Sequence, residues 1–357
     1  MQKGISALDE QTVHTLSTNQ VVVSLQVAVK ELVENALDAG ATRITVRLVE
    51  NGLELIEVRD NGSGIDGENF DRIAMRHATS KIQAFDDLEK LNTFGFRGEA
   101  LAALAAISTL KMTTKCQTDK IGTEIEFDQF GGVKSKTVKV QSTVGSAVQI
   151  VKLFHRIPVR RSVLIQNSKR ELQKTLVTLM GYALTSDTRL VVQLQTGKVT
   201  KTSIQTKLNE SLKSKISSVL GAEIALKLTE IDDKLEPSKI DIESFFNLAE
   251  SASDSKYDEI RQKVDIFSFS GFVSRNDELG GGRTAPDRQF IFVNSRPVDV
   301  PFLTKVLNAE WRKCSSKRYP VIVLNINVDQ SAVDVNLAPD KRTVLLQNQK
   351  HCQFRFK

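Results

Sequence analysis

Carboxylate and amide side chains recur at helical spacing in the segment KELVENALD, which ends at Asp38. Glu31, Asn35 and Asp38 stand at positions i, i+4 and i+7, so a helix places all three on one face. A carboxylate one turn from an amide oxygen can hold a water molecule next to a metal ion. Glu34 falls on another face, where it can pair with Lys30. The alternative for this segment by itself is a solvated helix face.

A second motif, DNGSGI, begins at Asp60 and directly follows a strand-like segment. One carboxylate at the end of a strand can accept a hydrogen bond from the exocyclic amine of adenine. Gly62 and Gly64 would let a ligand approach the backbone, because glycine has no Cβ. Since Asp, Asn and Gly are also favoured turn residues, a plain turn is the alternative.

The third motif, GFRGEAL, spans 95–101 and runs from a glycine-rich loop into a helix rich in Ala and Leu. Free amides at a helix N-terminus make an anion site that suits phosphates. The sequence contains no Walker A motif, and a capped helix start is the alternative. Thr79, Ser80 and Lys81 supply hydroxyls and a cation between the second and third motifs, although a bland polar loop fits them equally well.

Periodicity and turn residues predict the elements that carry these motifs. A helix is predicted over 20–39 with Gly40 just beyond its end, and another over 99–107. Asn51-Gly52 predicts a hairpin between strands 44–49 and 53–59. Further predicted elements are strands 110–114, 122–127, 133–140, 147–153 and 189–195, and a helix over 169–184. Helices and mostly antiparallel strands in this arrangement predict an α/β sandwich.

A chain of 357 residues predicts about two domains. The Ser-, Lys- and Gln-rich stretch 200–215 is the expected boundary, which gives domains 1–210 and 211–357. Within the second domain, the acidic, Ser-rich stretch 229–259 is expected to be an exposed, flexible insertion. The expected strands of this domain are 266–273, 289–293, 319–328 and 332–336.

Composition narrows the class of protein. Forty-nine basic against 43 acidic residues give a net charge of +6, which permits nucleic-acid contact without establishing it. The three cysteines are widely separated and fit a reducing compartment. No apolar run long enough to span a membrane and no signal-peptide pattern is present, so neither secretion nor membrane insertion is expected.

The order of the motifs ELVEN, DNGSGI, ATSKI and GFRGEAL resembles that of the GHKL ATPases. The residues within each motif resemble those of the MutL mismatch-repair family. The resemblance extends over nearly the whole chain through LFHRIPVRR at 153–161, FVNSRPV at 292–298 and VDVNLAPDK at 333–341. The opening STNQV at 17–21 resembles the eukaryotic PMS-type paralogue.

The resemblance implies a Bergerat-type α/β ATPase sandwich followed by an α+β domain similar to the second domain of ribosomal protein S5. It assigns Glu31 as the general base, Asn35 as the Mg²⁺ ligand and Asp60 as the adenine-binding carboxylate, with Gly62 and Gly64 shaping that pocket. Lys341 corresponds to a lysine that reaches the γ-phosphate from the second domain. The lid residues are Thr79, Ser80 and Lys81, and the phosphate-loop residues are Gly95, Arg97, Gly98, Glu99, Ala100 and Leu101.

The same resemblance implies slow ATP hydrolysis with ATP and Mg²⁺ as cofactors, in the nucleus, and no membrane contact. ATP-driven closure would couple mismatch recognition to repair. The implied partners are a MutL-type subunit in a heterodimer, a MutS-type recognition complex and DNA bound without sequence preference. The family's C-terminal dimerisation region and its endonuclease motif have no counterpart here, so the chain resembles an N-terminal portion.

Two departures and three rivals stand beside this interpretation. Gly145-Ser146 replaces the usual Gly-Thr, and His155-Arg156-Ile157 replaces the usual residues before Pro158. The first rival is another GHKL machine, either a chaperone or a type II topoisomerase, and the second is a GHKL histidine kinase. The third is a DNA-binding scaffold with a vestigial ATP site, which an assay of ATP turnover distinguishes.

Overall fold

The computed structural model describes residues 21–76, 78, 93–95, 98–141, 143–231, 238–248, 253–275, 282–315, 317–334 and 342–355. The chain divides into two compact units. The first contains residues 1–183 and 187–210, and the second contains residues 184–186 and 211–357.

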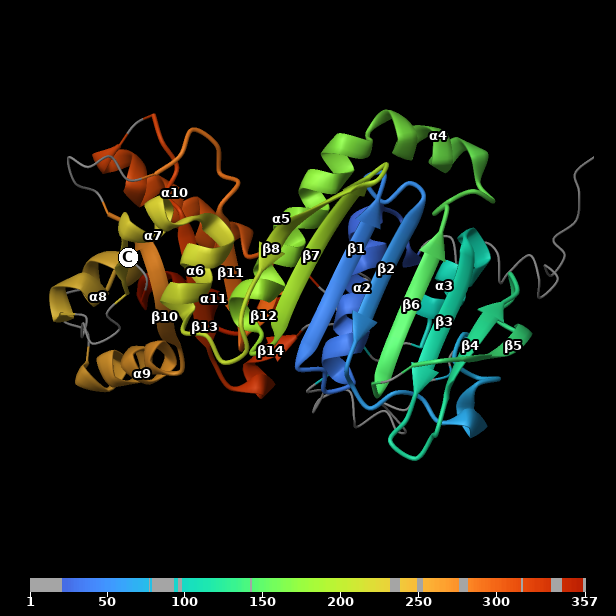
Figure 1. Ribbon diagram of the computed structural model, residues 1–357. Coiled ribbons are helices and arrows are strands. Elements are labelled where there is room, and N and C mark those ends of the chain that lie inside the picture. The colour runs from blue at the N-terminus through green and yellow to red at the C-terminus, as the bar shows by residue number, and fades with distance from the viewer. Residues whose placement is uncertain are drawn as a thin grey trace, which may run out of the picture. The chain divides into compact units, whose positions relative to one another are not determined.

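The first unit is built on an eight-stranded sheet with the order β5-β4-β3-β6-β2-β1-β7-β8 (Figure 1). Its strands are β1 Arg43–Val49, β2 Leu55–Asp60, β3 Thr109–Lys115, β4 Gly122–Phe127, β5 Val133–Lys139, β6 Gly145–Val151, β7 Arg189–Thr196 and β8 Val199–Gln205. Strands β1 and β7 pair in parallel, whereas the other neighbours pair antiparallel.

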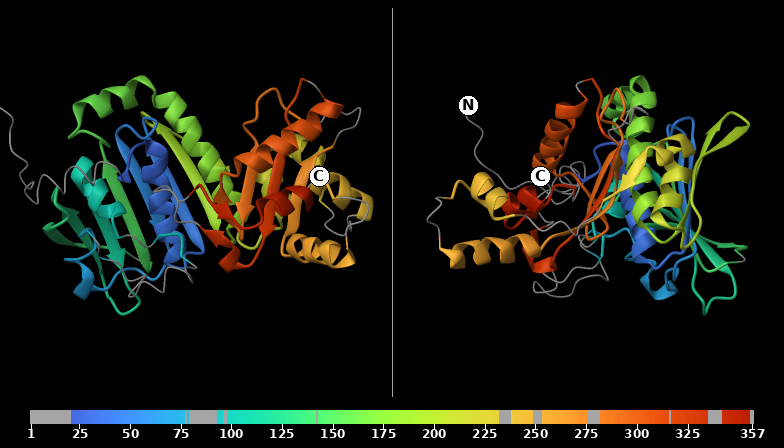
Figure 2. Two further views of the ribbon diagram at one scale, coloured as in Figure 1. Left: turned by 180° about the vertical axis from the view of Figure 1, so that it is seen from behind. Right: turned by 90° about the vertical axis from the view of Figure 1, so that its left-hand side faces the viewer.

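Helices cover one face of this sheet and leave the other open (Figures 1 and 2). They are α2 Leu25–Asp38, α3 Ala100–Ile107 and α5 Ser168–Thr185, and α4 Pro158–Gln166 precedes α5. A short 3-10 helix, η1, spans Gly67–Asn69. Apolar side chains that alternate along the strands pack under the helices, as Ile44, Val46 and Leu48 of β1 do, each at most 1% exposed.

Helix α2 carries the first predicted motif and begins five residues later than its predicted start. Ser24 caps it by accepting a hydrogen bond from the Val27 amide at 3.2 Å, so the first helical residue is Leu25. The helix ends at Asp38, and Gly40 has a φ of +72°, as a residue after a helix end commonly does. Lys30, Glu31 and Glu34 are among its buried residues. Of the three residues on the predicted face, Glu31 is buried, whereas Asn35 and Asp38 are half-buried.

The predicted hairpin between β1 and β2 is confirmed, and its turn starts one residue early. Glu50 and Asn51 both have positive φ, of 51° and 58°, and the Gly52 amide donates to the Val49 carbonyl at 3.0 Å. Val49 pairs with Leu55, so this turn is the first part of a five-residue loop over 50–54. The register that results places Val46 opposite Val58.

The second unit has a five-stranded sheet with the order β12-β11-β13-β10-β9. Its elements are α6 Leu212–Leu220, α7 Ala222–Leu226, β9 Leu228–Glu230, α8 Lys239–Phe246, α9 Asp254–Asp265, β10 Ser268–Ser274, β11 Gln289–Val293, β12 Arg296–Val298, α10 Pro301–Cys314, β13 Ile322–Asn327, η3 Gln330–Ala332, β14 Val333–Asp334, β15 Leu345–Leu346 and α11 Gln349–Arg355. Helices α10 and α11 lie on one face of the sheet and α6 on the other (Figures 1 and 2).

The acidic stretch 229–259, expected to be an exposed, flexible insertion, contains the helix α8 and the start of α9, and most of the residues in these two helical segments are exposed. Ile242 from α8 and Tyr257 and Ile260 from α9 are buried in one cluster with Phe354 of α11. Acidic and serine residues dominate the composition of this stretch. A few apolar side chains at helical spacing nevertheless anchor it, because a helix needs only one buried stripe.

Candidate nucleotide-binding site

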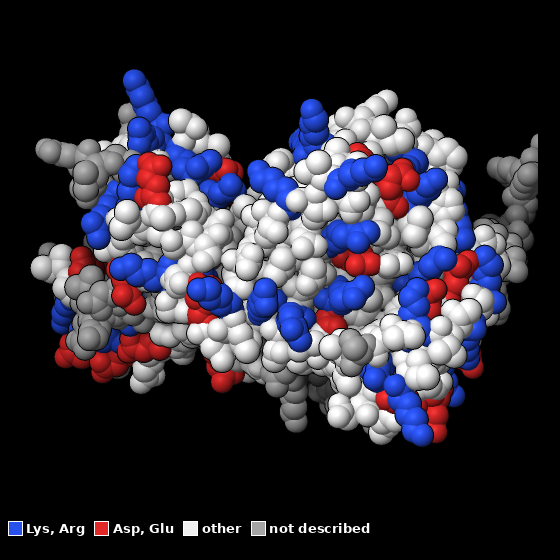
Figure 3. Space-filling view, viewed as in Figure 1, with Lys and Arg blue, Asp and Glu red and all other residues white. Residues whose placement is uncertain are grey.

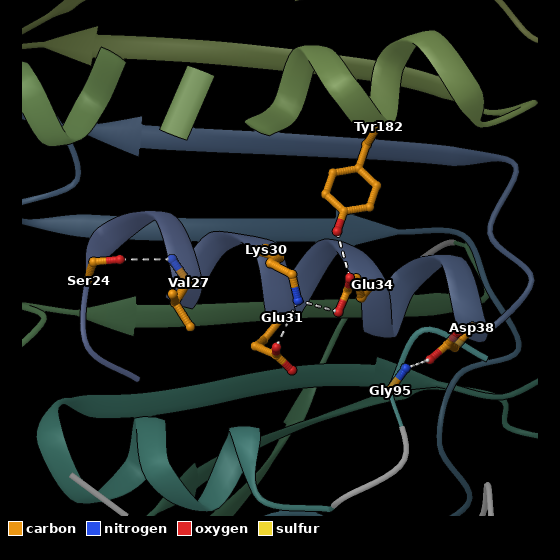
Figure 4. A network of polar contacts seen from close by, with 8 residues as sticks. All are labelled: Ser24, Val27, Lys30, Glu31, Glu34, Asp38, Gly95 and Tyr182. Carbon is orange, nitrogen blue, oxygen red and sulfur yellow. Dashed lines mark hydrogen bonds and ion pairs between the residues drawn. The ribbon is translucent and has the colours of Figure 1, made fainter. Parts of the chain in front are cut away.

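The centre of α2 holds a buried cation between two carboxylates (Figure 4). The Lys30 Nζ lies 3.1 Å from Glu31 Oε1 and 2.9 Å from Glu34 Oε2. The three residues are 3%, 8% and 3% exposed, respectively. Removing charges from water is costly, and pairing them offsets only part of that cost, so this triad stabilises the core less than apolar packing would.

The balance of forces on Lys30 keeps it protonated. Burial lowers its pKa, but the negative charges of Glu34 and Glu31 and their hydrogen bonds outweigh burial and raise the pKa above its ordinary value. Tyr182 of α5 donates a hydrogen bond to Glu34 Oε1 at 2.6 Å, so both oxygens of Glu34 are engaged. The prediction that Glu34 pairs with Lys30 is confirmed.

Asp38, at the end of α2, fixes the start of the glycine-rich segment. Its Oδ1 accepts the Phe94 amide at 2.8 Å, and its Oδ2 accepts the Gly95 amide at 2.9 Å. The Phe94 ring also meets the Tyr182 ring edge-on, with the ring centroids 5.9 Å apart. The structure therefore brings Gly95 to the same end of α2 as Asp38, while Asn35 is half-buried one helical turn from Glu31.

The Asp60 carboxylate is held at the end of β2 by two backbone amides. Its Oδ1 accepts the Gly62 amide at 2.8 Å and the Ser146 amide at 3.3 Å. Burial raises the pKa of Asp60, and the two hydrogen bonds oppose that rise without cancelling it. A half-buried carboxylate in a fixed orientation can act as the acceptor for a single amine of a ligand.

Gly62 and Gly64 allow close packing of the loop that follows β2, and their predicted role in shaping the ligand pocket stays a prediction. A Cβ on Gly62 would lie 2.7 Å from the Ala39 carbonyl oxygen, and one on Gly64 would lie 2.2 Å from that of Lys115. Gly64 also has a φ of +71°. The space that each missing Cβ leaves is taken by the protein's own backbone, so both glycines are required for close packing of this loop.

The roles of Ser146 and Thr114 were not predicted from the sequence. Their hydroxyls lie 2.9 Å apart, and Thr114 Oγ1 also accepts the Ile65 amide at 2.9 Å. Gly145 precedes Ser146 with a φ of +128°, and a Cβ there would lie 2.3 Å from the Asp60 carbonyl oxygen. The glycine at the first position of β6 is the one feature of the sequence that pointed to this contact.

Four of the predicted phosphate-loop residues fall within the described chain besides Gly95. Gly98 has a φ of +60°, and its missing Cβ leaves room for the Ala78 carbonyl oxygen at 2.4 Å. Glu99 is the N-cap residue of α3 and pairs with Arg76 at 3.2 Å. Ala100 and Leu101 open the helix itself. Thr79, Ser80, Lys81, Arg97 and Lys341 lie outside the described residues.

The LFHRIPVRR segment has a structural role on the evidence of its contacts. Arg156 Nη1 donates to the Ala105 carbonyl near the end of α3 at 2.8 Å. Arg161 Nη1 donates to the carbonyls of Leu53 and Leu153 at 2.8 and 3.1 Å. Basic side chains on carbonyl groups at helix and strand ends satisfy acceptors that have no partner in the element itself.

Two general properties accompany the site. None of the helices in the described part of the chain is long and apolar enough to cross a membrane. Among the same residues, no group of three or more His, Cys, Asp or Glu side chains is arranged to hold a metal ion.

Two protein-family models match the chain, and each match lies mainly within one of the two compact units. Residues 23–153 match the histidine kinase-, DNA gyrase B- and HSP90-like ATPases, and residues 216–356 match the C-terminal domain of DNA mismatch repair proteins. The first match contains Glu31, Asn35 and Asp60 and so covers the α2 triad and the carboxylate at the end of β2.

Curated relatives and solved structures agree with these matches. Mismatch repair endonuclease PMS2 of Gallus gallus is 41% identical over 98% of this chain and 39% of that protein, and DNA mismatch repair protein PMS1 of Saccharomyces cerevisiae is 37% identical over 97% and 39%. The crystal structure of the N-terminal domain of a DNA repair protein is 34% identical, with a TM-score of 0.79 over 96% of both chains. The Aquifex aeolicus MutL ATPase domain complexed with ADP is 25% identical, with a TM-score of 0.57 over 86% of this chain and 93% of that one.

The fold and the matched models define a GHKL-type ATPase domain followed by a mismatch-repair domain similar to the second domain of ribosomal protein S5. The chain belongs to the MutL family of DNA mismatch repair proteins, and its curated relatives are of the PMS type. The predicted family and fold class are thereby confirmed. The chain spans about two fifths of the length of these curated relatives, at 39%.

Proposed function

We propose that this chain binds ATP with Mg²⁺ in its first unit and hydrolyses it slowly, with Glu31 as the general base. The observation that carries the proposal is the triad on α2. A helix that buries two carboxylates and a lysine at 8% exposure or less gives up stability that an apolar core would retain. Perturbed, buried ionisable groups gather at functional sites for this reason.

Adenine is the part of the nucleotide that Asp60 would recognise. Its Oδ1 is held by the amides of Gly62 and Ser146, which leaves the carboxylate oriented to accept the exocyclic amine. Guanine carries a carbonyl at the corresponding position, and a carboxylate cannot donate to it. ATP is therefore favoured over GTP.

The α2 face and the start of α3 would hold the phosphates. Asn35 offers an amide oxygen, the kind of hard ligand that Mg²⁺ takes beside phosphate oxygens and water. Asp38 holds the loop at Phe94 and Gly95, and the N-terminal amides of α3 suit an anion. Glu31 would accept a proton from the attacking water, and Lys341 would contact the γ-phosphate.

Replacing the base tests the proposed chemistry directly. Glu31→Ala is expected to lower turnover by about 10²-fold or more and to leave ATP binding nearly intact, as is typical when a positioned base is lost. Glu57→Ala is the matched control, because Glu57 is 9% exposed, lies on β2 and is bonded to Gln149. Turnover at the wild-type rate in Glu31→Ala would show that the base is another group.

ATP binding in this family member is proposed to close a lid over the nucleotide and to couple mismatch recognition to downstream repair. The proposed partners are a MutL-type subunit and a MutS-type recognition complex. The proposed location is the nucleus, in keeping with PMS-type relatives that act in mismatch repair.

Sequence-independent DNA binding is the remaining part of the proposal. Figure 3 shows basic side chains spread over the sheet face that the helices leave open. Arg43 and Arg189 are exposed and stand directly opposite each other on β1 and β7. Like charges in that position disfavour the sheet, so an anion that bridges them would be stabilising.

The salt dependence of the affinity for DNA tests the proposed DNA binding. The dissociation constant for duplexes of unrelated sequence should rise steeply between about 50 and 200 mM salt, because phosphate contacts release counterions. Replacing both Arg43 and Arg189 by Gln should reduce the slope of log affinity against log salt by roughly 2. An affinity that does not change with salt contradicts the proposal.

A further inference from the structure

A chain of polar contacts leads from α5 into the centre of α2. Tyr182 Oη donates to Glu34 Oε1 at 2.6 Å, Lys30 Nζ donates to Glu34 Oε2 at 2.9 Å, and the same Nζ lies 3.1 Å from Glu31 Oε1. Figure 4 shows Tyr182 and the Glu31 carboxylate on opposite sides of α2, with Lys30 and Glu34 between them. The tyrosine thus reaches Glu31 through two intermediate side chains.

We propose that Tyr182, acting through Glu34 and Lys30, is a positioning residue that fixes the Glu31 carboxylate for ATP hydrolysis. The inference rests on the proposed role of Glu31 as the base and adds the set of residues that orients it. Tyr182 itself touches neither nucleotide nor water in this scheme.

The reason lies in how many free rotations each side chain keeps. Glutamate and lysine are long side chains that lose much rotational entropy when they are held in place. Tyrosine has only two such rotations, and the Tyr182 ring, at 2% exposure, is further fixed by its edge contact with Phe94. A rigid donor can therefore anchor Glu34, and Glu34 in turn anchors Lys30.

The effect on chemistry follows from geometry. A general base works only within hydrogen-bond reach of the proton that it takes. Since Lys30 holds one oxygen of Glu31, any motion of the lysine is passed to the carboxylate. Glu34 limits that motion because its two oxygens are held from two different helices, α2 and α5.

If Tyr182 served only to fill space in the core, its aromatic ring alone would be sufficient. Phenylalanine at position 182 would fill the same space and keep the contact with Phe94, so the hydroxyl accounts for the polar link alone. The chain provides a second pair of the same kind, in which Tyr257 of α9 donates to Glu243 of α8 in the second unit. That pair has no connection to the α2 triad and serves as the control.

The experiment compares Tyr182→Phe with Tyr257→Phe in steady-state ATP hydrolysis, ADP titration and thermal melting. Tyr182→Phe is expected to lower kcat on the order of 10-fold, since small misplacements of a reacting group are costly. KM and ADP affinity should stay within about twofold, because neither depends on a positioned base. Tyr257→Phe should leave kcat unchanged.

A double variant separates this inference from the proposed function. In the Glu31→Ala background, Tyr182→Phe should cause no further loss of kcat, because the residue that it positions is already absent. A further 10-fold loss in that background, or equal kcat in Tyr182→Phe and Tyr257→Phe, overturns the inference. A parallel loss of ADP affinity also overturns it. Wild-type turnover in Glu31→Ala alone would instead remove the proposed base.

Discussion

The interiors of the two units differ in what they bury. Within the described part of the chain, the buried carboxylates Glu31, Glu34 and Glu57 all belong to the first unit. The main core of the second unit is a cluster of aliphatic and aromatic side chains with Cys352, packed between its sheet and helices α10 and α11. Buried charges rarely stabilise a fold more than apolar packing does, so the contrast supports the proposed catalytic role for the buried carboxylates of the first unit.

The largest expected effect comes from removing the cation of the α2 triad. Lys30→Met leaves Glu31 and Glu34 buried without their shared partner, which should lower the free energy of unfolding by about 3–5 kcal/mol and abolish turnover. The matched control is Lys215→Met in the second unit. Lys215 is also buried, but its Nζ donates to the Ser186 carbonyl at 2.9 Å. That change should cost about 1–3 kcal/mol. Denaturant unfolding measures the free energy of unfolding of both variants. Equal losses would contradict the proposed difference between the two units.

Next in size is a cavity in the second unit. Leu324 of β13 is fully buried in the apolar cluster, so Leu324→Ala should lower the free energy of unfolding by about 2–5 kcal/mol. ADP affinity of the folded variant should stay at the wild-type value, because the adenine and α2 residues belong to the first unit. A large loss of ADP affinity at a temperature where the variant is folded would contradict the division of roles.

A smaller effect is expected at the adenine carboxylate. Asp60→Asn keeps the shape of the side chain but replaces one acceptor oxygen by a donor amide. A hydrogen bond to a charged group contributes about 1.5–3 kcal/mol, so ATP affinity should fall by roughly one to two orders of magnitude. Isothermal titration of the wild type and the variant measures this change. Unchanged affinity would remove Asp60 from the pocket.

The smallest effect concerns pH. Burial raises the pKa of Asp60, so its contribution to stability is fully present below the unfolded-state pKa and is lost as pH rises through the folded-state pKa. Adenine recognition has the opposite sign, since it needs the ionised carboxylate and weakens as pH falls through that raised pKa. ADP titrations at decreasing pH should show this weakening in the wild type, beginning at a higher pH than an ordinary aspartate would give. Asp60→Asn should lack it.

Sequence reasoning succeeded where a single segment contained the whole signal. The helical spacing of Glu31, Asn35 and Asp38, and the turn at Asn51-Gly52, are local patterns, and strands with alternating apolar residues follow the same rule. The helices at 239–246 and 254–265 were missed because their acidic composition masked a narrow apolar stripe. Composition averages over a segment, whereas burial depends on one face.

The contacts that complete the site could not be read from the sequence, because they join distant segments. Tyr182 and Glu34 are separated by 148 positions, and the Ser146 amide lies 86 positions from Asp60. No local pattern encodes such a pair, since the partners meet only after the sheet has placed β6 beside β2 and α5 has packed over it. Lys341 lies outside the described residues, so its proposed contact with the γ-phosphate stays a prediction.

The parallel pairing of β1 with β7 has a consequence for how the chain folds as it leaves the ribosome. Residues 43–49 cannot pair with residues 189–195 until the latter are synthesised, and every element from β2 to α5 is made in between. Contacts between such distant segments form slowly. Until β7 is synthesised, β1 presents an unpaired edge in a strand with one apolar face, which is the kind of edge that pairs with other chains. Nascent or truncated chains that stop before residue 189 should therefore depend on chaperones, and they should aggregate through this edge where chaperones are scarce.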